Sequence, residues 1–322
     1  MGRDRAQSVV ALGGGHGLHA SLSALRRLVD DLTVDELTAI VTVADNGGSS
    51  GRLRGEFGVL PPGDLRMALA ALCGDDEWGD TWARVLQHRF AGAGEMRDHV
   101  VGNLLIVGLW ELLGDHVDAL DWVGRLLGAK GRVLPMALTP MDICAEVRGL
   151  AADPDQLTTV RGQVEVATTD GVIVSIGLEP PDPAVSPVAL QAIGDADWVV
   201  LGPGSWFTSV IPHLIVPALR DALVTTGADL VVVLNLEEQE GETPGFGPAD
   251  HLAVLAEHAP QLKVHMVLAD GDRVGAELDA LRETVAAYGA ELMVADLAAD
   301  DGSPRHDPTK LAAAYAAIFD AH

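Results

Sequence analysis

The sequence predicts an α/β fold: a Rossmann-like, doubly wound and mostly parallel sheet with a helical insertion and a small inserted β region. Short runs of β-branched and apolar residues alternate with amphipathic helical patterns along the chain. Glycine-rich loops follow several of those runs directly. Residues 8–44 contain, in order, a strand pattern, a glycine loop, a helix pattern and a second strand pattern, which is how a doubly wound sheet begins.

Hydrophobic spacing defines the first elements. Residues 8–12 are apolar and β-branched, and they predict a strand. Apolar residues then recur at helical spacing from Leu18 to Val29, which predicts an amphipathic helix. A second buried strand is expected at 38–44. Because residues 46–63 are rich in Gly, Ser and Pro, we expect a loop there and no regular element.

The rest of the chain predicts one α/β domain, residues 1–322, with no repeat and no linker long enough to divide it. Helical patterns dominate from residue 64 to about 128, and a β-rich insertion follows at about 131–178. The strands expected in that insertion are 131–137, 146–149, 162–168 and 171–178. The further strands of the main sheet are expected at 197–201, 229–235, 263–269 and 291–295, and further helices at 249–258, 275–288 and 308–320.

The charge balance excludes whole classes of partner. The chain of 322 residues has 21 Lys and Arg against 47 Asp and Glu, a formal net charge of −26. Such a protein repels the phosphates of DNA, RNA and anionic membranes over any wide face, so we expect no nucleic acid and no membrane insertion. An anionic ligand must be held locally, by a few arginines and by backbone N–H groups.

Cysteine usage and hydropathy point to the cytoplasm. Cys73 and Cys144 lie in apolar contexts without metal-site or disulfide spacing, so we expect two reduced thiols. The longest apolar run, 104–113, is too short to span a bilayer and predicts a buried helix. Residues 1–5 lead directly into the first strand without a signal-peptide pattern, so a cytoplasmic protein is expected.

The first glycine loop is a candidate phosphate site. Glycines allow close approach of a ligand to backbone N–H groups, and the start of the next helix adds unpaired donors. The pattern matches two positions of G-x-G-x-x-G, but Leu18 replaces the third glycine, and a tight turn without a ligand stays an alternative. The candidate residues are Gly13, Gly14, Gly15, His16, Gly17 and Leu18.

The second loop joins a strand-end acid, glycines, two hydroxyls and three arginines. Arginine offers planar bidentate donors for phosphate, and serines with backbone N–H groups can complete an anion site. A solvated surface loop explains the glycines but not the clustered arginines, whose substitution by alanine should weaken anion binding. The candidate residues are Asp45, Asn46, Ser49, Ser50, Arg52, Arg54, Pro62, Gly63, Asp64 and Arg66.

A third glycine loop follows the strand expected at 197–201, at the sheet edge where open α/β sheets bind ligands. Its hydroxyls can bind phosphate or ribose, or cap the next helix. Its candidate residues are Gly202, Gly204, Ser205, Thr208 and Ser209. Further candidates lie near helix starts or strand ends, with Phe246 suited to stacking on a base or sugar: Asn103, Asn235, Gln239, Glu242, Phe246 and Arg305.

Residue types give little support for catalysis or a resident metal. No His–Cys–Asp spacing indicates zinc, and neither a G-x-S-x-G motif nor a Cys–His arrangement indicates covalent catalysis. Asp45 is the best candidate for a general base or a divalent-metal ligand, but its neighbour is Asn46 and not a second carboxylate. We therefore predict no catalytic residues, no metal site and no required cofactor.

Taken together, the loops resemble the YvcK family of gluconeogenesis factors. The resemblance is carried by Gly13-Gly14-Gly15-His16-Gly17-Leu18, by the stretch from Thr42 to Arg66, and by Val101-Gly102-Asn103-Leu104-Leu105. It continues through Gly202-Pro203-Gly204-Ser205, Gly241-Glu242-Thr243 and Arg305-His306-Asp307. These motifs follow the family order, so the resemblance covers essentially the whole chain.

The resemblance implies a relative of the CofD phospholactate transferases that binds UDP-N-acetylglucosamine or UDP-glucose. It implies a role in cell shape and cell-wall precursor control during gluconeogenic growth, and partners that include a cell-wall or metabolic enzyme, a Ser/Thr kinase and a further copy of the chain. This sequence departs from the family pattern at His16, Asn46, Met67, Asp98 and Phe246. The Asn46 departure weighs against metal-assisted chemistry.

Two functions from different classes follow. The first is a UDP-sugar-binding regulatory protein without turnover. The second is a CofD-like transferase that moves a phosphoryl-linked group from a nucleotide, with Asp45 as base or metal ligand and the arginines on the phosphates. An NAD-dependent oxidoreductase is disfavoured, because the fingerprint is broken at Leu18.

Overall fold

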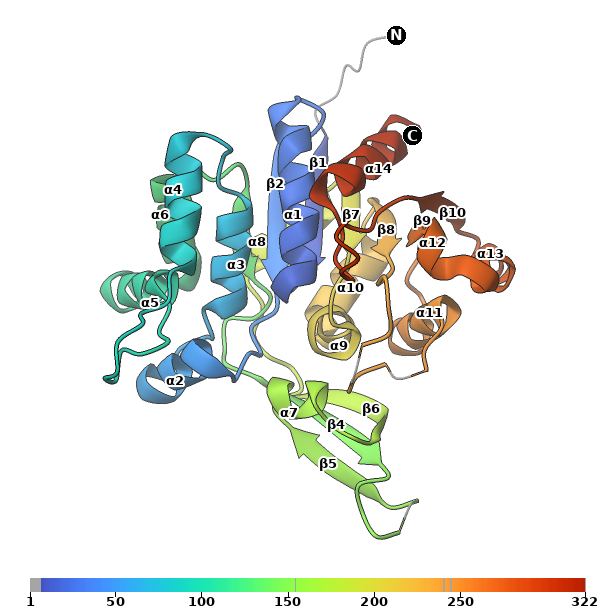
Figure 1. Ribbon diagram of the computed structural model, residues 1–322, viewed down its shortest axis with the longest axis horizontal. Helices are drawn as coiled ribbons and strands as arrows, with labels where there is room; N and C mark the ends of the chain where they lie inside the picture. Colours follow the sequence, from blue (N-terminus) through green and yellow to red (C-terminus); the bar gives the residue numbers. More distant parts are fainter. Residues whose placement is uncertain (1–6, 154, 240, 244, 322) are drawn as a thin grey trace.

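The computed structural model describes residues 7–153, 155–239, 241–243 and 245–321, so the N-terminal residues 1–5, for which no signal-peptide pattern was expected, lie outside the described part. Seven strands form one parallel sheet in the order β10-β9-β8-β7-β1-β2-β3 (Figure 1). Its strands are β1 (Ser8–Gly13), β2 (Glu36–Val41), β3 (Arg132–Pro135), β7 (Trp198–Leu201), β8 (Asp229–Val233), β9 (Met266–Asp270) and β10 (Glu291–Ala295).

The longer helices of the described part of the chain include those that cover both faces of this parallel sheet. They are α1 (Gly15–Asp30), α2 (Gly48–Phe57), α3 (Gly63–Ala71), α4 (Glu77–Gln87), α5 (Val101–Leu113), α6 (His116–Leu127), α8 (Pro187–Asp195), α10 (Pro217–Thr225), α11 (Pro248–His258), α13 (Leu278–Ala287) and α14 (Pro308–Ala321). Helices α1, α3 and α14 lie in front of the sheet in Figure 1, while α8 and α10 lie behind it.

Short helices complete the connections. These are α7 (Gln163–Ala167), a π-helix (Trp206–Val210), α9 (Pro212–Ile215), α12 (Gly271–Val274) and a 3-10 turn (Gly275–Glu277). The strand order reverses between β7 and β1, which pair in parallel, and this crossing is where doubly wound sheets bind ligands. The predicted Rossmann-like fold is therefore confirmed.

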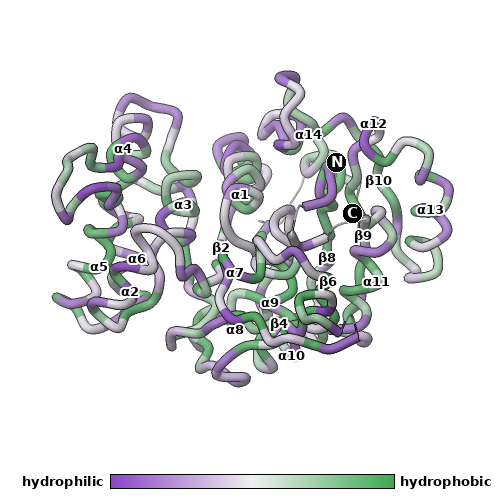
Figure 2. The backbone as a smooth tube through the Cα atoms, turned by 60° about the horizontal axis from the view of Figure 1, so that its bottom comes forward, coloured by the Kyte–Doolittle hydropathy of each residue, from purple (hydrophilic) through white to green (hydrophobic). Residues whose placement is uncertain are grey.

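The core follows the hydrophobic runs of the sequence. Every residue of β7 and of β9 is buried, as expected for central strands covered on both faces. Figure 2 shows hydrophobic segments along strands such as β2 and β8, and hydrophilic stretches on outer helices and loops. Among the described residues, no helix is both long and apolar enough to cross a membrane.

The small inserted sheet is antiparallel and has the order β5-β4-β6. Its strands are β4 (Asp142–Arg148), β5 (Leu157–Arg161) and β6 (Val172–Glu179). In Figure 1 this sheet and α7 project below the carboxyl ends of the main strands. The insertion thus lies beside the edge of the main sheet that carries the glycine loops.

Three predicted elements were wrong. The segment 131–137 supplies β3 of the main sheet instead of a strand of the insertion, because it pairs with β2. The segment 162–168 forms helix α7 and not a strand. The stretch 46–63 contains helix α2 although it is rich in glycine. In each case, contacts distant in sequence override the local pattern.

Candidate functional site

A cavity of about 780 Å³ opens at the crossing between β1 and β7. The first and third glycine loops meet there. A Cβ on Gly17 would overlap the carbonyl oxygen of Pro203 and the Cα of Gly204, so only glycine permits this contact. The two loops predicted from the sequence therefore form one continuous wall.

The start of α1 forms the first side of the cavity, with Gly14, Gly15, His16 and Gly17 among its lining residues. Gly14 occupies the N-cap position and has no side chain to cap this 16-residue helix, while the Gly15 N–H of its first turn donates to Asp64. Its first N–H groups and the positive end of its dipole therefore suit an anion.

Asp64 at the start of α3 also lines the cavity, half-buried beneath the first loop. Its Oδ2 atom would lie 2.7 Å from a Cβ on Gly14. Burial, and next the nearby Asp45 carboxylate, raise the pKa of Asp64 to about 7, although a hydrogen bond from the Gly15 backbone acts in the opposite direction. Asp64 can therefore exchange a proton near neutral pH.

The third glycine loop is held in place by side chains that were predicted to bind a ligand. Asn235 accepts a hydrogen bond from the Gly204 N–H (3.0 Å) and donates one to the Gly204 carbonyl (2.8 Å). Gln239 accepts from the Trp206 N–H at 3.0 Å. Asn235 and Gln239 also line the cavity, so they can support the loop and face a ligand.

Glu242 supports the same loop from behind the cavity and is 4% exposed. Its carboxylate accepts from the Phe207 N–H at 2.9 Å and from the Thr208 hydroxyl at 2.7 Å, and it also contacts the Ser205 hydroxyl. Glu242 does not line the cavity, so these hydrogen bonds give it a structural role in holding the loop.

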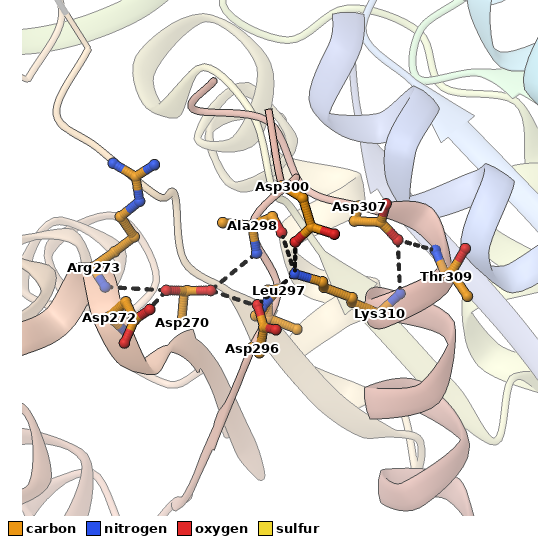
Figure 3. A network of polar contacts seen from close by, with 10 residues as sticks. All are labelled: Asp270, Asp272, Arg273, Asp296, Leu297, Ala298, Asp300, Asp307, Thr309 and Lys310. Carbon is orange, nitrogen blue, oxygen red and sulfur yellow. Dashed lines mark hydrogen bonds and ion pairs between the residues drawn. The ribbon is translucent and has the colours of Figure 1, made fainter. Parts of the chain in front are cut away.

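The segment between β10 and α14 forms another side, and it carries Arg305. Figure 3 shows how this segment is fixed. Asp270, at the end of β9, accepts from the Leu297 and Ala298 N–H groups at 2.7 and 3.0 Å, and it also caps α12. Lys310 binds the Ala298 carbonyl at 2.9 Å as well as two carboxylates.

Arg305 is the cation best placed for an anionic ligand. It is the one Arg or Lys among the described residues that line the cavity, and it is held by Ser303 (3.0 Å) and Asp301 (2.8 Å). Its neighbour His306 also lines the cavity, but burial lowers the pKa of His306 to about 4, so this ring is neutral at pH 7. Asp307 caps α14 by accepting a hydrogen bond from the Thr309 N–H at 2.7 Å.

The fourth side comes from helix α7, through Gln163, Val164 and Ala167. This contribution was not predicted, because the sequence pattern of 162–168 indicates a strand of a separate β region. Two acids after β8 were also missed. Glu237 pairs with Arg273, and Glu238 accepts a hydrogen bond from the Gly245 N–H.

The structure thus brings together part of the predicted site. The predicted residues that line the cavity are Gly14, Gly15, His16, Gly17, Asp64, Gly204, Ser205, Thr208, Ser209, Asn235, Gln239 and Arg305. Those that lie outside its lining are Gly13, Leu18, Asp45, Asn46, Ser49, Ser50, Arg52, Arg54, Pro62, Gly63, Arg66, Asn103, Gly202, Glu242 and Phe246.

The three clustered arginines do not converge on this cavity. Arg52 donates to the carbonyls of Glu95 and Arg97 at 3.2 and 2.7 Å. Arg54 forms a 2.6 Å ion pair with Asp142 of the small sheet.

Arg66 is 5% exposed and donates to the Gly63 carbonyl at 3.4 Å. Burial, and next the Arg89 cation, lower the pKa of Arg66 to about 10. The three predicted arginines thus have separate environments, and none lines the cavity.

The remaining predicted residues make other internal contacts. The Ser49 hydroxyl lies 3.1 Å from His99 Nδ1 and accepts from the Asn103 side chain at 3.1 Å. Phe246 packs edge-to-face with Phe207, at a centroid separation of 6.0 Å. Within the described residues, no group of three His, Cys, Asp or Glu side chains could hold a metal ion.

Comparison with known proteins identifies the family. The model of the family described as 2-phospho-L-lactate transferase CofD matches residues 9–302. The chain belongs to the CofD family. The CofD-family chain is 54% identical over 307 residues to a gluconeogenesis-factor relative of Mycobacterium tuberculosis, covering 95% of this chain and 88% of the relative.

A second relative, the gluconeogenesis factor of Listeria monocytogenes, is 34% identical to this CofD-family chain over 330 residues, covering 99% of this chain and 98% of the relative. A crystal structure of a UPF0052-family member from Bacillus halodurans is 32% identical, with a TM-score of 0.83 over 97% of this chain and 99% of that one. The resemblance found from the sequence is confirmed.

Proposed function

We propose that this CofD-family protein is a cytoplasmic regulatory protein that binds UDP-N-acetylglucosamine or UDP-glucose in the cavity at the β1–β7 crossing. The observation that carries the proposal is the meeting of two glycine loops, the start of α1 and Arg305 around one cavity. Its volume of about 780 Å³ lies within the range of roughly 300–1,000 Å³ typical of small-molecule sites.

The charges around the cavity suggest how such a ligand lies. The diphosphate fits the N–H groups of the glycine loops, the start of α1 and Arg305. The sugar hydroxyls fit the side near Glu237 and Glu238, because carboxylates accept hydrogen bonds from hydroxyls and repel phosphates. A nucleotide-sugar offers both kinds of group in one molecule.

The gluconeogenesis-factor relatives give the biological setting of the proposal. In that setting, the protein reports the level of a UDP-sugar and controls cell-wall precursors and cell morphology during gluconeogenic growth. Its output would pass to a cell-wall or metabolic enzyme, with a Ser/Thr kinase and self-association as further controls.

Isothermal titration calorimetry with UDP-N-acetylglucosamine, UDP-glucose and UDP tests the proposal. Arg305→Ala should weaken binding about tenfold, since one charge-assisted contact is lost. Arg282→Ala is the matched control and should bind as the wild type, because Arg282 is an exposed residue of α13 paired with Asp279. Absence of heat and of thermal stabilisation with every UDP-sugar would overturn the proposal.

Arg52→Ala and Arg54→Ala belong in the same series. The sequence analysis expects both arginines on the phosphates, whereas their partners in the structure are Glu95, Arg97 and Asp142. Weakening by either substitution as large as that of Arg305→Ala would place the diphosphate beside α2 and away from the β1–β7 crossing.

One observation favours the alternative, a CofD-like transferase. Asp64 lines the cavity with a pKa of about 7, which suits a general base. In that reaction an acceptor hydroxyl oxygen would attack the donor phosphorus, a nucleoside monophosphate would leave, and the hydroxyl proton would pass to Asp64. Incubation with Mg²⁺, a nucleotide-linked donor and candidate acceptors, followed by mass spectrometry, should then give a product that Asp64→Asn abolishes. No product would remove the alternative and leave the binding proposal intact.

A further inference from the structure

Helix α7 belongs to the inserted segment, yet it forms a wall of the cavity at the main sheet. Gln163, Val164 and Ala167 all line that cavity. A helix of five residues has little stability of its own, so its place must be fixed by contacts with other elements. Two of those contacts come from a residue that does not touch the cavity.

That residue is Asn46, in the loop after β2. Its side-chain oxygen accepts a hydrogen bond from the Val164 N–H at 3.1 Å. Its side-chain nitrogen donates to Glu165 Oε2 at 2.7 Å. Asn46 therefore binds one of the first N–H groups of α7 and the acidic side chain of its first turn at the same time.

Two glycines, Gly162 and Gly47, allow the loop after β2 and the start of α7 to approach each other closely around this pair. A Cβ on Gly162 would overlap both Glu165 Oε2 and Asn46 Nδ2, so the pair lies directly against a glycine at the N-cap of α7. A Cβ on Gly47 would come within 2.9 Å of Val164 Cγ2. The loop after β2 and the start of α7 are thus in close contact at Asn46 and Gly47.

We propose that Asn46 is a positioning residue that fixes α7 as a wall of the ligand cavity, and that it must be an amide because its partner is Glu165. An amide can accept from Val164 and donate to Glu165, whereas a carboxylate can only accept. Aspartate at this position would bring two carboxylates to hydrogen-bond distance and push α7 away. The effect on ligand affinity rests on the proposed function.

Four variants test this pairing: Asn46→Asp, Glu165→Gln, the double variant, and Gly162→Ala. Asn46→Asp should weaken UDP-sugar binding about tenfold in calorimetry and speed hydrogen exchange of amides 163–168 in the free protein. Glu165→Gln is the matched control and should match the wild type, because glutamine still accepts from Asn46. The double variant should restore both the affinity and the slow exchange, because the glutamine side chain of Glu165→Gln can donate to the carboxylate of Asn46→Asp. Gly162→Ala should resemble Asn46→Asp, because the added Cβ would push the two side chains apart.

The hydrogen-exchange measurement needs no ligand, so it separates the two proposals. If no UDP-sugar binds the wild type, the proposed function fails while exchange at 163–168 still decides the role of Asn46. Unchanged exchange in Asn46→Asp, or a double variant no better than Asn46→Asp, would overturn the positioning role. A thermal unfolding curve for each variant identifies any that fails to fold, and in that case the comparison of Glu165→Gln with the double variant decides.

Discussion

Gly17 makes the contact on which the cavity depends, because its Cα lies against Pro203 and Gly204 of the other glycine loop. Gly17→Ala should therefore lower the free energy of unfolding by about 1–3 kcal/mol through overpacking. Gly55→Ala is the control: Gly55 is exposed in α2 with open space around it, so alanine there should stabilise by about 0.5–1 kcal/mol. Urea unfolding measures the change in the free energy of unfolding for both variants, provided that the m-value stays the same. Equal midpoints for the two variants would contradict the contact.

Asp64 predicts a dependence of stability on pH. Its folded-state pKa of about 7 lies above the ordinary value of 3.8, so folding favours the protonated form. Stability from this group is complete below pH 3.8 and is lost as the pH rises through 7. Asp64→Asn should therefore stabilise the protein at pH 8, by on the order of 2 kcal/mol, and by little near pH 4. Thermal unfolding across this range measures the difference, and a constant difference would refute it.

The side chains of Arg52 and Arg54 show which features could be predicted from the sequence and which could not. The clustering of Arg52 and Arg54 after a strand could be read from the sequence, and it predicted phosphate binding there. The partners of these arginines could not be read from the sequence, because Asp142 and the carbonyl of Arg97 come from distant segments. An arginine can bind a phosphate, a carboxylate or a carbonyl, so the fold determines which one it meets.

At the scale of elements, Asp270 joins β9 to the segment that carries Arg305 (Figure 3). Burial alone would raise the pKa of Asp270, but hydrogen bonds from four backbone N–H groups outweigh it and hold the pKa below its ordinary value. The stabilisation that the Asp270 carboxylate contributes is present above its unfolded-state pKa and is lost as the pH falls through its folded-state pKa. Asp270→Asn should therefore cost about 3 kcal/mol at pH 7 and less in acid.

The control for this prediction is Asp279→Asn. The Asp279 side chain is 93% exposed, and its pairing with Arg282 should contribute little. Thermal unfolding of both variants between pH 3 and 7 gives the comparison. If Asp270→Asn is no less stable at pH 7 than Asp279→Asn, the anchoring role of Asp270 is wrong.

Helices and strands with a strong hydrophobic periodicity could be predicted from the sequence. Elements whose conformation depends on contacts with other segments could not. Helix α1 and the strands β1 and β2 follow directly from apolar spacing. Helix α2 contains three glycines, and Gly51 is required there because a Cβ would overlap the Asn46 carbonyl. The alternating valines of α7 resemble a strand, but Gly162 turns the chain at φ 111° and Asn46 holds the helix start.

At the scale of the whole molecule, the class of sheet could be anticipated and the position of the insertion could not. The first strand–loop–helix–strand unit implied a doubly wound sheet, and hence a ligand site at the strand ends. That the small sheet would return α7 to this site depends on contacts such as Asn46 with Glu165 and Arg54 with Asp142, which no local pattern encodes. The cavity is therefore a property of the complete fold.

The net charge of −26 leads to a prediction about the rate of ligand binding. The proposed ligand, an anionic UDP-sugar, approaches an acidic protein whose cavity has, among the described residues, one arginine beside Asp64, Glu237, Glu238 and Asp307, so repulsion should slow the encounter. Raising the salt concentration from about 20 to about 500 mM shortens the Debye length from roughly 20 Å to below 5 Å, and should raise the association rate constant by about two- to fivefold. Stopped-flow measurements with the UDP-sugar test this, with uncharged uridine as the control whose rate should stay constant. A rate that falls with salt would mean that the start of α1 and Arg305 dominate the field at the cavity mouth, so that the acidity of the molecule is without consequence for its ligand.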